Sequence, residues 1–165
     1  DIIHESILNK INDYDKVSFV GFSMGGLVAR AYLNKYHLPK LDKVVMIGTP
    51  NNGSEVSDFF EKKNFYKRLL GPAGSQLTTT FQNKHSLFGK IYYECGVIAG
   101  NLPLDFCYPI MMHSPSDGKV SVRSTKVDNM KDHIILKSPH WYLLQSKEAW
   151  IQALYFLQYS KFCHR

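Results

Sequence analysis

The stretch VSFVGFSMGG, residues 17–26, decides the fold. Its first six residues, Val17 to Phe22, form a short and almost continuous apolar run, which is typical of a parallel strand buried on both faces. Gly25 to Tyr36 follows directly, with apolar residues at helical spacing. The sequence therefore predicts a strand that turns at once into a helix, with Ser23 at the corner. The apolar face expected for this helix comprises Leu27, Val28, Ala31 and Tyr32.

The corner itself carries the pattern Gly-x-Ser-x-Gly. A turn this sharp strains the backbone and brings neighbouring chain very close, so we expect Gly21 and Gly25 to be required and Gly26 to relax the crowding further. The corner lifts the Ser23 hydroxyl off the sheet, and the first helical turn offers the Met24 N–H to a developing oxyanion. A flexible Gly-Ser turn without chemistry is the plain alternative.

The alternation of strands and helices continues along the chain and predicts an α/β fold with a parallel sheet, built as a single domain over residues 1–165. Besides the elements at the corner, the expected helices cover 5–11, 55–61 and a final stretch with an apolar stripe of Trp150, Ala153, Leu154 and Leu157. The expected strands cover 43–48, 94–99 and 133–137, with 109–112 either a short strand or an extended loop.

A serine hydroxyl needs an adjacent base, and histidine suits this task near neutral pH. His140 directly follows the last predicted strand, at the carboxyl edge where catalytic groups gather in open α/β sheets. His133 enters the same strand at the opposite edge. We therefore predict that His140 is the base. Of the other histidines, His4 and His37 lie on or beside helices at the wrong end of the sheet, and His164 lies in the C-terminal tail. His85 and His113 stay open as alternatives for the base.

The third group must be a carboxylate that orients the histidine. Asp117 lies in Ser-Asp-Gly-Lys-Val, in the loop that follows the third strand, and Val120 and Val122 continue at extended spacing. An ordinary turn aspartate is the plain alternative for Asp117. Asp105 occupies the same connection and is the second choice. The later aspartates, Asp128 and Asp132, lie beside the entry of the last strand.

Several segments now point to a family. With the corner, GTPNNGS at 48–54, GPAGSQL at 71–77, VIAG at 97–100 and SDGKVSVRST at 116–125, the chain resembles the α/β-hydrolase superfamily, in particular a lipase/esterase-like subgroup with a GTP-x-x-GS segment. The resemblance implies the chain order Ser23, Asp117, His140 and the α/β-hydrolase fold. It also implies cleavage of carboxylic esters through an acyl-enzyme, without a metal or an organic cofactor.

The same resemblance makes the aromatic-rich insertion at about 54–93 a cap over the site, although an ordinary helical layer would have the same composition. Phe22, Thr49 and Asn51 are expected to line the substrate. The chain resembles the C-terminal part of the domain, apparently lacking the N-terminal strands and their oxyanion loop. We expect the N-terminal remainder of the domain, or an oligomeric partner, to complete the sheet.

Two other functions stay open: an acyltransferase or thioesterase with the same three residues, and a weakly active pseudoenzyme or binding module. The net charge of +6 comes from scattered basic residues, so a nucleic-acid partner is not expected. The expected substrate is a small-molecule or lipid ester, and a substrate at a membrane surface stays open. No apolar run approaches the roughly 18 residues that span a bilayer. Three cysteines without a paired spacing indicate neither zinc nor a disulfide framework and favour a reducing, cytoplasmic compartment.

Overall fold

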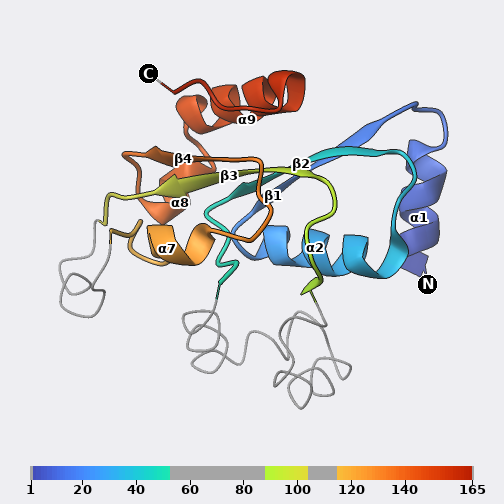
Figure 1. Cartoon of the computed structure of the whole chain (residues 1–165), viewed down its shortest axis with the longest axis horizontal. Coiled ribbons are helices and arrows are strands. Elements are labelled where there is room, and N and C mark those ends of the chain that lie inside the picture. Colours follow the sequence, from blue (N-terminus) through green and yellow to red (C-terminus); the bar gives the residue numbers. More distant parts are fainter. Residues whose placement is uncertain (1, 53–87, 104–114, 165) are drawn as a thin grey trace, which may run out of the picture.

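The computed structural model describes residues 2–52, 88–103 and 115–164 (Figure 1). The predicted helix 55–61, the segment 109–112, most of the insertion at 54–93, and Asp105, His85 and His113 lie outside these residues. The elements are α1 (Ile2–Ile11), β1 (Val17–Phe22), α2 (Met24–Tyr36), β2 (Leu41–Ile47), β3 (Glu94–Gly100), α7 (Val122–Thr125), β4 (Asp132–Leu136), α8 (His140–Leu143) and α9 (Lys147–Tyr159).

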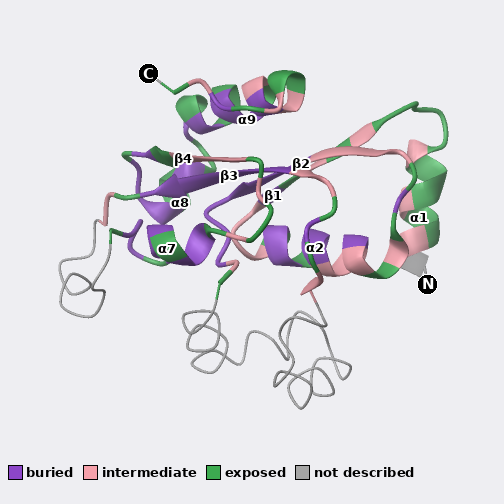
Figure 2. Ribbon diagram, viewed as in Figure 1, coloured by how far each residue is buried: buried purple, intermediate pink, exposed green. Residues whose placement is uncertain are grey.

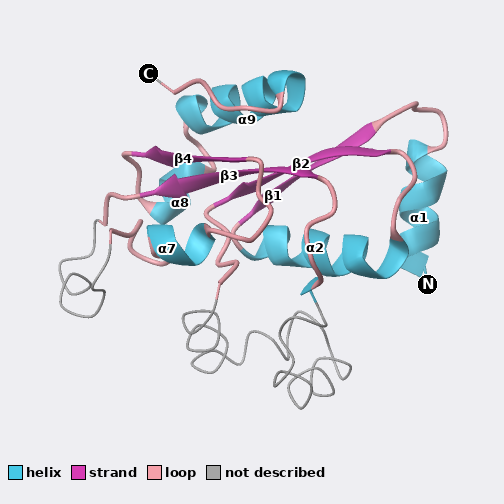
Figure 3. Cartoon of the chain, in the orientation of Figure 1, coloured by secondary structure: helices cyan, strands magenta, loops and turns pink. Residues whose placement is uncertain are grey.

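The four strands form one parallel sheet in the order β1-β2-β3-β4 (Figure 3). Val45 of β2 pairs with Val20 on one side and with Gly96 on the other. Since parallel strands place their carboxyl ends at one edge, the residues after β1, β3 and β4 approach one another there. The predicted α/β fold with a parallel sheet is confirmed.

Helices cover both faces of the sheet: α9 lies on one face, and α2 and α7 lie on the other (Figure 1). The alternation of side chains along β2 explains the two cores, because Val45 and Ile47 pack with Phe156 of α9, whereas Val44 and Met46 pack with Leu33 of α2. Strands β2 and β3 are accordingly buried over most of their length (Figure 2). Within the described residues, no helix is long and apolar enough to cross a membrane.

The buried faces of the two long helices agree with the predicted ones only in part: Leu27 and Ala153 are buried as expected, but other residues differ. In α9, Leu154 is 64% exposed, and the helix buries Phe156, whose ring lies where a Cβ on Gly96 would stand. In α2, Val28 is 53% exposed, and Arg30 is buried instead. Val122 begins a short helix rather than continuing an extended segment, because the Ser121 hydroxyl caps it by accepting a hydrogen bond from the Ser124 N–H.

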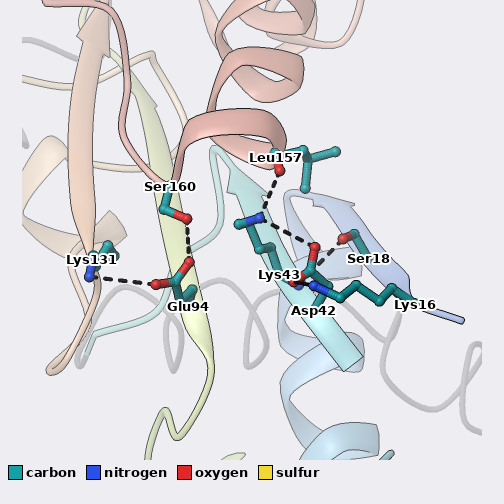
Figure 4. A network of polar contacts seen from close by, with 8 residues as sticks. All are labelled: Lys16, Ser18, Asp42, Lys43, Glu94, Lys131, Leu157 and Ser160. Atoms are coloured by element: carbon teal, nitrogen blue, oxygen red, sulfur yellow. Dashed lines mark hydrogen bonds and ion pairs between the residues drawn. The ribbon is translucent and has the colours of Figure 1, made fainter. Parts of the chain in front are cut away.

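The amino edge of the sheet carries ion pairs (Figure 4). The Asp42 carboxylate forms ion pairs with Lys16 at 3.5 Å and with Lys43 at 3.3 Å. The Glu94 carboxylate forms one with Lys131 at 3.5 Å. The Ser160 hydroxyl also bonds Glu94, and this hydrogen bond is the largest single cause that lowers the pKa of the Glu94 carboxyl. The bond between Ser160 and Glu94 fastens the end of α9 to the sheet, far from the carboxyl edge.

Candidate active site

Ser23 stands at the corner between β1 and α2 with φ 51° and ψ −120°. A side chain at positive φ is strained, and this corner is held in place by a hydrogen bond from the Ser23 N–H to the carbonyl of Ile47 in the neighbouring strand, at 2.7 Å. Met24 is the first residue of α2, so its N–H has no carbonyl one turn earlier in that helix to bond. The corner therefore exposes both a hydroxyl and an N–H at the carboxyl edge.

The glycines at the corner show which positions the fold requires. A Cβ on Gly21 would lie 2.6 Å from the Cα of Gly26, and a Cβ on Gly26 would overlap the side chain of Thr49. A Cβ on Gly25 would meet no atom of the described residues within 4 Å. The expectation that Gly25 is sterically required is wrong, because the close approach runs between β1 and the next residue of α2.

His140 opens α8 directly after β4, and its side chain reaches back to the corner. Its Nε2 lies 3.0 Å from the Ser23 Oγ. The Phe22 ring packs beside the imidazole, with 5.1 Å between ring centroids. Gly48, at φ 57°, passes behind the imidazole, where a Cβ would lie 3.3 Å from the His140 Nδ1. A side chain at position 48 would therefore press on the imidazole, and the glycine leaves room for it.

Asp117 holds the other side of the imidazole. Its Oδ2 lies 2.8 Å from the His140 Nδ1, and its side chain has no exposed surface. The second oxygen, Oδ1, accepts hydrogen bonds from the N–H groups of Lys119 at 2.9 Å and Val120 at 2.8 Å. The His140 N–H also donates to the Asp117 carbonyl at 2.9 Å. Backbone and side chain together fix this carboxylate against the ring.

The remaining described histidines lie elsewhere. His133, at the start of β4, bonds the Thr125 hydroxyl at 3.1 Å, and burial, followed by the charge of Lys126, lowers its pKa. His4 stacks on Tyr36. The last two are His37, the C-cap of α2, and His164, which bonds Asp132 in the C-terminal tail. None of these four approaches the corner.

The other carboxylates also serve different contacts. Asp132 accepts hydrogen bonds from the N–H groups of Phe162 and His133. Burial acts to raise the pKa of this carboxyl, but these bonds and His164 outweigh it and lower the pKa. Asp128 is exposed. Across the described part of the chain, no three His, Cys, Asp or Glu side chains are grouped so that they could hold a metal ion.

The residues predicted to line the substrate fall in different surroundings. Phe22 is half-buried beside His140, as described above. Thr49 has no exposed surface and packs on Gly26. The Asn51 side chain accepts a hydrogen bond from Arg30 at 3.0 Å and donates one to the Thr125 carbonyl at 2.8 Å, so it is engaged on both sides.

Arg30 and Gly48 are the residues near the site that the sequence reasoning missed. The signal for Arg30 was available, because it stands three residues after Leu27 and three before Leu33, on the apolar face of the helix. A cation at such a place is unusual and marks a buried polar contact. Gly48 gives no comparable signal, since its positive φ depends on how the strand ends.

The sheet order, the strained corner and the residues at its carboxyl edge define the class of this protein as an α/β hydrolase. Residues 5–103 match the family described as "Alpha/beta hydrolase of unknown function (DUF915)", and the chain belongs to this family. No curated protein matches the sequence.

Solved structures with the same fold share little sequence with the chain. The mature lipase BlEst2 of Bacillus licheniformis matches with a TM-score of 0.57 and 19% identity, over 96% of this chain and 70% of that one. The product of gene lin2722 from Listeria innocua matches with a TM-score of 0.55 and 20% identity, over 99% of this chain and 68% of that one. At such identities the likeness concerns the fold.

Proposed function

We propose that the protein is a serine hydrolase of carboxylic esters, with Ser23 as nucleophile, His140 as base and Asp117 as the orienting carboxylate. One observation carries this proposal: an unbroken series of contacts runs from the Ser23 Oγ through both imidazole nitrogens to the Asp117 carboxylate, at 3.0 Å and 2.8 Å. The lipase BlEst2 of Bacillus licheniformis, which shares this fold, supports the choice of an ester substrate.

In the first half of the reaction, the ionised Asp117 accepts the Nδ1–H of His140, which leaves Nε2 free to accept a proton. The Ser23 oxygen forms a bond to the ester carbonyl carbon while its proton passes to Nε2. The Met24 N–H stabilises the negative charge on the former carbonyl oxygen. The bond to the leaving alkoxide then breaks, and the alkoxide takes the proton from Nε2, which yields the alcohol and an acyl-enzyme.

The second half repeats these steps with water. His140 takes a proton from water as the oxygen attacks the acyl carbon. The bond to the Ser23 oxygen then breaks, and that oxygen regains a proton from Nε2. The products are a carboxylic acid and the free serine, so the protons balance over the cycle. The serine proton moves between the Ser23 Oγ and the His140 Nε2, which already lie 3.0 Å apart.

A fluorophosphonate probe tests this proposal, because it labels only an activated serine. We expect labelling at Ser23, identified by peptide mass, together with hydrolysis of p-nitrophenyl acetate. Ser23→Ala should lose both. Ser18→Ala is the matched control, since Ser18 lies on the same strand at the amino edge, and it should label like the wild type. A folded wild-type chain that neither labels nor hydrolyses the ester would refute the proposal.

A further inference from the structure

Arg30 is a buried cation in the middle of α2, only 6% exposed. Its guanidinium donates to the Asn51 side-chain oxygen at 3.0 Å and to the Gly89 carbonyl at 3.2 Å, and it lies over the Phe88 ring at 5.5 Å. Within the described parts of the chain, its Nε has no hydrogen-bond partner. In the described residues, no carboxylate forms an ion pair with it. The contacts are therefore neutral oxygens and one aromatic face.

Burial of this cation destabilises the folded state. A buried charge loses much of its hydration, and here burial is the largest cause that lowers the pKa of Arg30. An apolar side chain at this position of the helix would avoid that cost. The planar guanidinium can donate hydrogen bonds to two separate segments at once. One is Gly89, which precedes β3, and the other is Asn51, which follows β2.

The contact with Asn51 continues to the segment that carries Asp117. The Asn51 amide donates to the Thr125 carbonyl of α7, and the adjacent Asn52 exchanges two hydrogen bonds with Ser124, at 2.8 Å and 2.9 Å. Helix α7 in turn closes the loop around Asp117, because the Val122 N–H bonds the Pro115 carbonyl at 2.8 Å.

We propose that Arg30 and Asn51 are positioning residues that tie the helix behind the nucleophile to the loop that holds the orienting carboxylate. Neither residue contacts Ser23 or His140 in any hydrogen bond of the described chain. The pair fixes α2 against α7, and thereby the separation that the imidazole has to bridge between Ser23 and Asp117. This inference rests on the proposed function, since it assigns the pair a part in the same reaction.

The test compares the rate of fluorophosphonate labelling and the esterase constants of three variants of the whole chain. Asn51→Ala removes both side-chain hydrogen bonds of Asn51 and leaves only the 3.4 Å contact of Arg30 with the Asn51 carbonyl. Arg30→Lys replaces the fork by a single ammonium group. Asn51→Asp keeps an acceptor for Arg30 but removes the donor to the Thr125 carbonyl. Because small misplacements of reacting groups are costly, each should lower the labelling rate and kcat by about 10-fold or more. KM should change by less than about twofold, since substrate binding is untouched.

Two comparisons separate positioning from general stability. Leu33→Ala is the matched control on α2: it removes a fully buried side chain and should lower Tm, but below that Tm it should label at the wild-type rate. The double variant Arg30→Lys/Asn51→Ala should react no more slowly than the slower single variant, because both changes break the same link.

Three outcomes decide the matter. Slow labelling of the folded Asn51 and Arg30 variants, with normal labelling of Leu33→Ala, supports the inference. Labelling of the Asn51 variants at the wild-type rate overturns it and leaves the proposed function intact. A wild-type chain that does not label at Ser23 overturns both.

Discussion

The two edges of the sheet use the same kinds of side chain in opposite ways. At the carboxyl edge, Asp117 and His140 meet at 2.8 Å with side chains 0% and 11% exposed. At the amino edge, Lys131 and Glu94 meet at 3.5 Å with side chains 54% and 41% exposed (Figure 4). Each pair joins a carboxylate to a nitrogen base. Their surroundings differ: one pair is enclosed by backbone and core, and the other lies in water.

The difference shows how a fold assigns roles to ionisable groups. Water screens the exposed pair, so its geometry is loosely defined and its energy small. The enclosed pair cannot relax, because Asp117 also accepts two backbone N–H bonds and His140 is packed between Phe22 and Gly48. Only the enclosed pair has the fixed geometry that proton transfer requires. Four measurements would test this contrast.

The largest expected effect comes from neutralising one carboxylate at each edge. Asp117→Asn should lower kcat for p-nitrophenyl acetate by about 10⁴-fold, because an amide can hold the imidazole in the wrong tautomer. Glu94→Gln should leave kcat within about twofold. Steady-state kinetics of the two folded variants make the comparison. Similar losses in both would mean that the enclosed pair has no special part in the reaction.

The second effect concerns packing at the corner. Gly21→Ala should lower the free energy of unfolding by about 1–3 kcal/mol, because the new methyl group would press on the backbone of Gly26. Gly25→Ala meets open space and should be neutral or raise stability by about 0.5–1 kcal/mol, as expected for alanine in a helix. Urea unfolding of both variants measures this. A larger loss for Gly25→Ala would contradict the crowding that the structure shows.

A smaller effect depends on pH and lies at the start of β4. Burial lowers the pKa of folded His133 below the ordinary 6.5, so the unfolded chain binds a proton more readily. The free energy of unfolding should therefore fall as pH drops below about 6.5, towards the folded pKa. His133→Gln should show a shallower fall between pH 7 and 5.5 in urea titrations. An unchanged slope would show that His133 does not contribute to it.

The smallest effect belongs to the exposed ion pairs. Lys16→Met and Lys131→Met should each change the free energy of unfolding by about 0–1 kcal/mol, because their partners stay hydrated. Added salt should reduce even this difference. Denaturant curves at low and high ionic strength provide the measurement. A loss above about 2 kcal/mol for either lysine would remove the contrast between the two edges.

Local patterns explain what could be predicted of the fold. The run Val17 to Phe22 has the bounds of β1, and the helix after it begins one residue earlier than expected. These elements follow from hydrophobic spacing within a few residues. Helix α7 could not be predicted in this way, since Val120 and Val122 alternate as in a strand, and the cap at Ser121 decides the conformation. The buried face of α9 depends on Gly96, which is distant in the sequence.

The candidate site was predictable for a topological reason. Carboxyl ends of parallel strands meet at one edge, so His140 and Asp117 could be chosen from their places after strands, and the structure brings both to Ser23. Their catalytic roles stay predictions until the labelling is done. Side-chain contacts between loops are not visible in spacing, so the link from Arg30 through Asn51 to α7 emerged only from the coordinates.

The left-handed backbone at Ser23 sets stability against reactivity at a single position. Glycine is the residue that adopts such a conformation at no steric cost, but glycine carries no oxygen for the reaction. Selection for a more thermostable protein therefore cannot remove the backbone strain at this position. Substitutions that raise stability would have to occur elsewhere in the chain. Positions away from the carboxyl edge, such as the water-facing side of α9, are open to that kind of change.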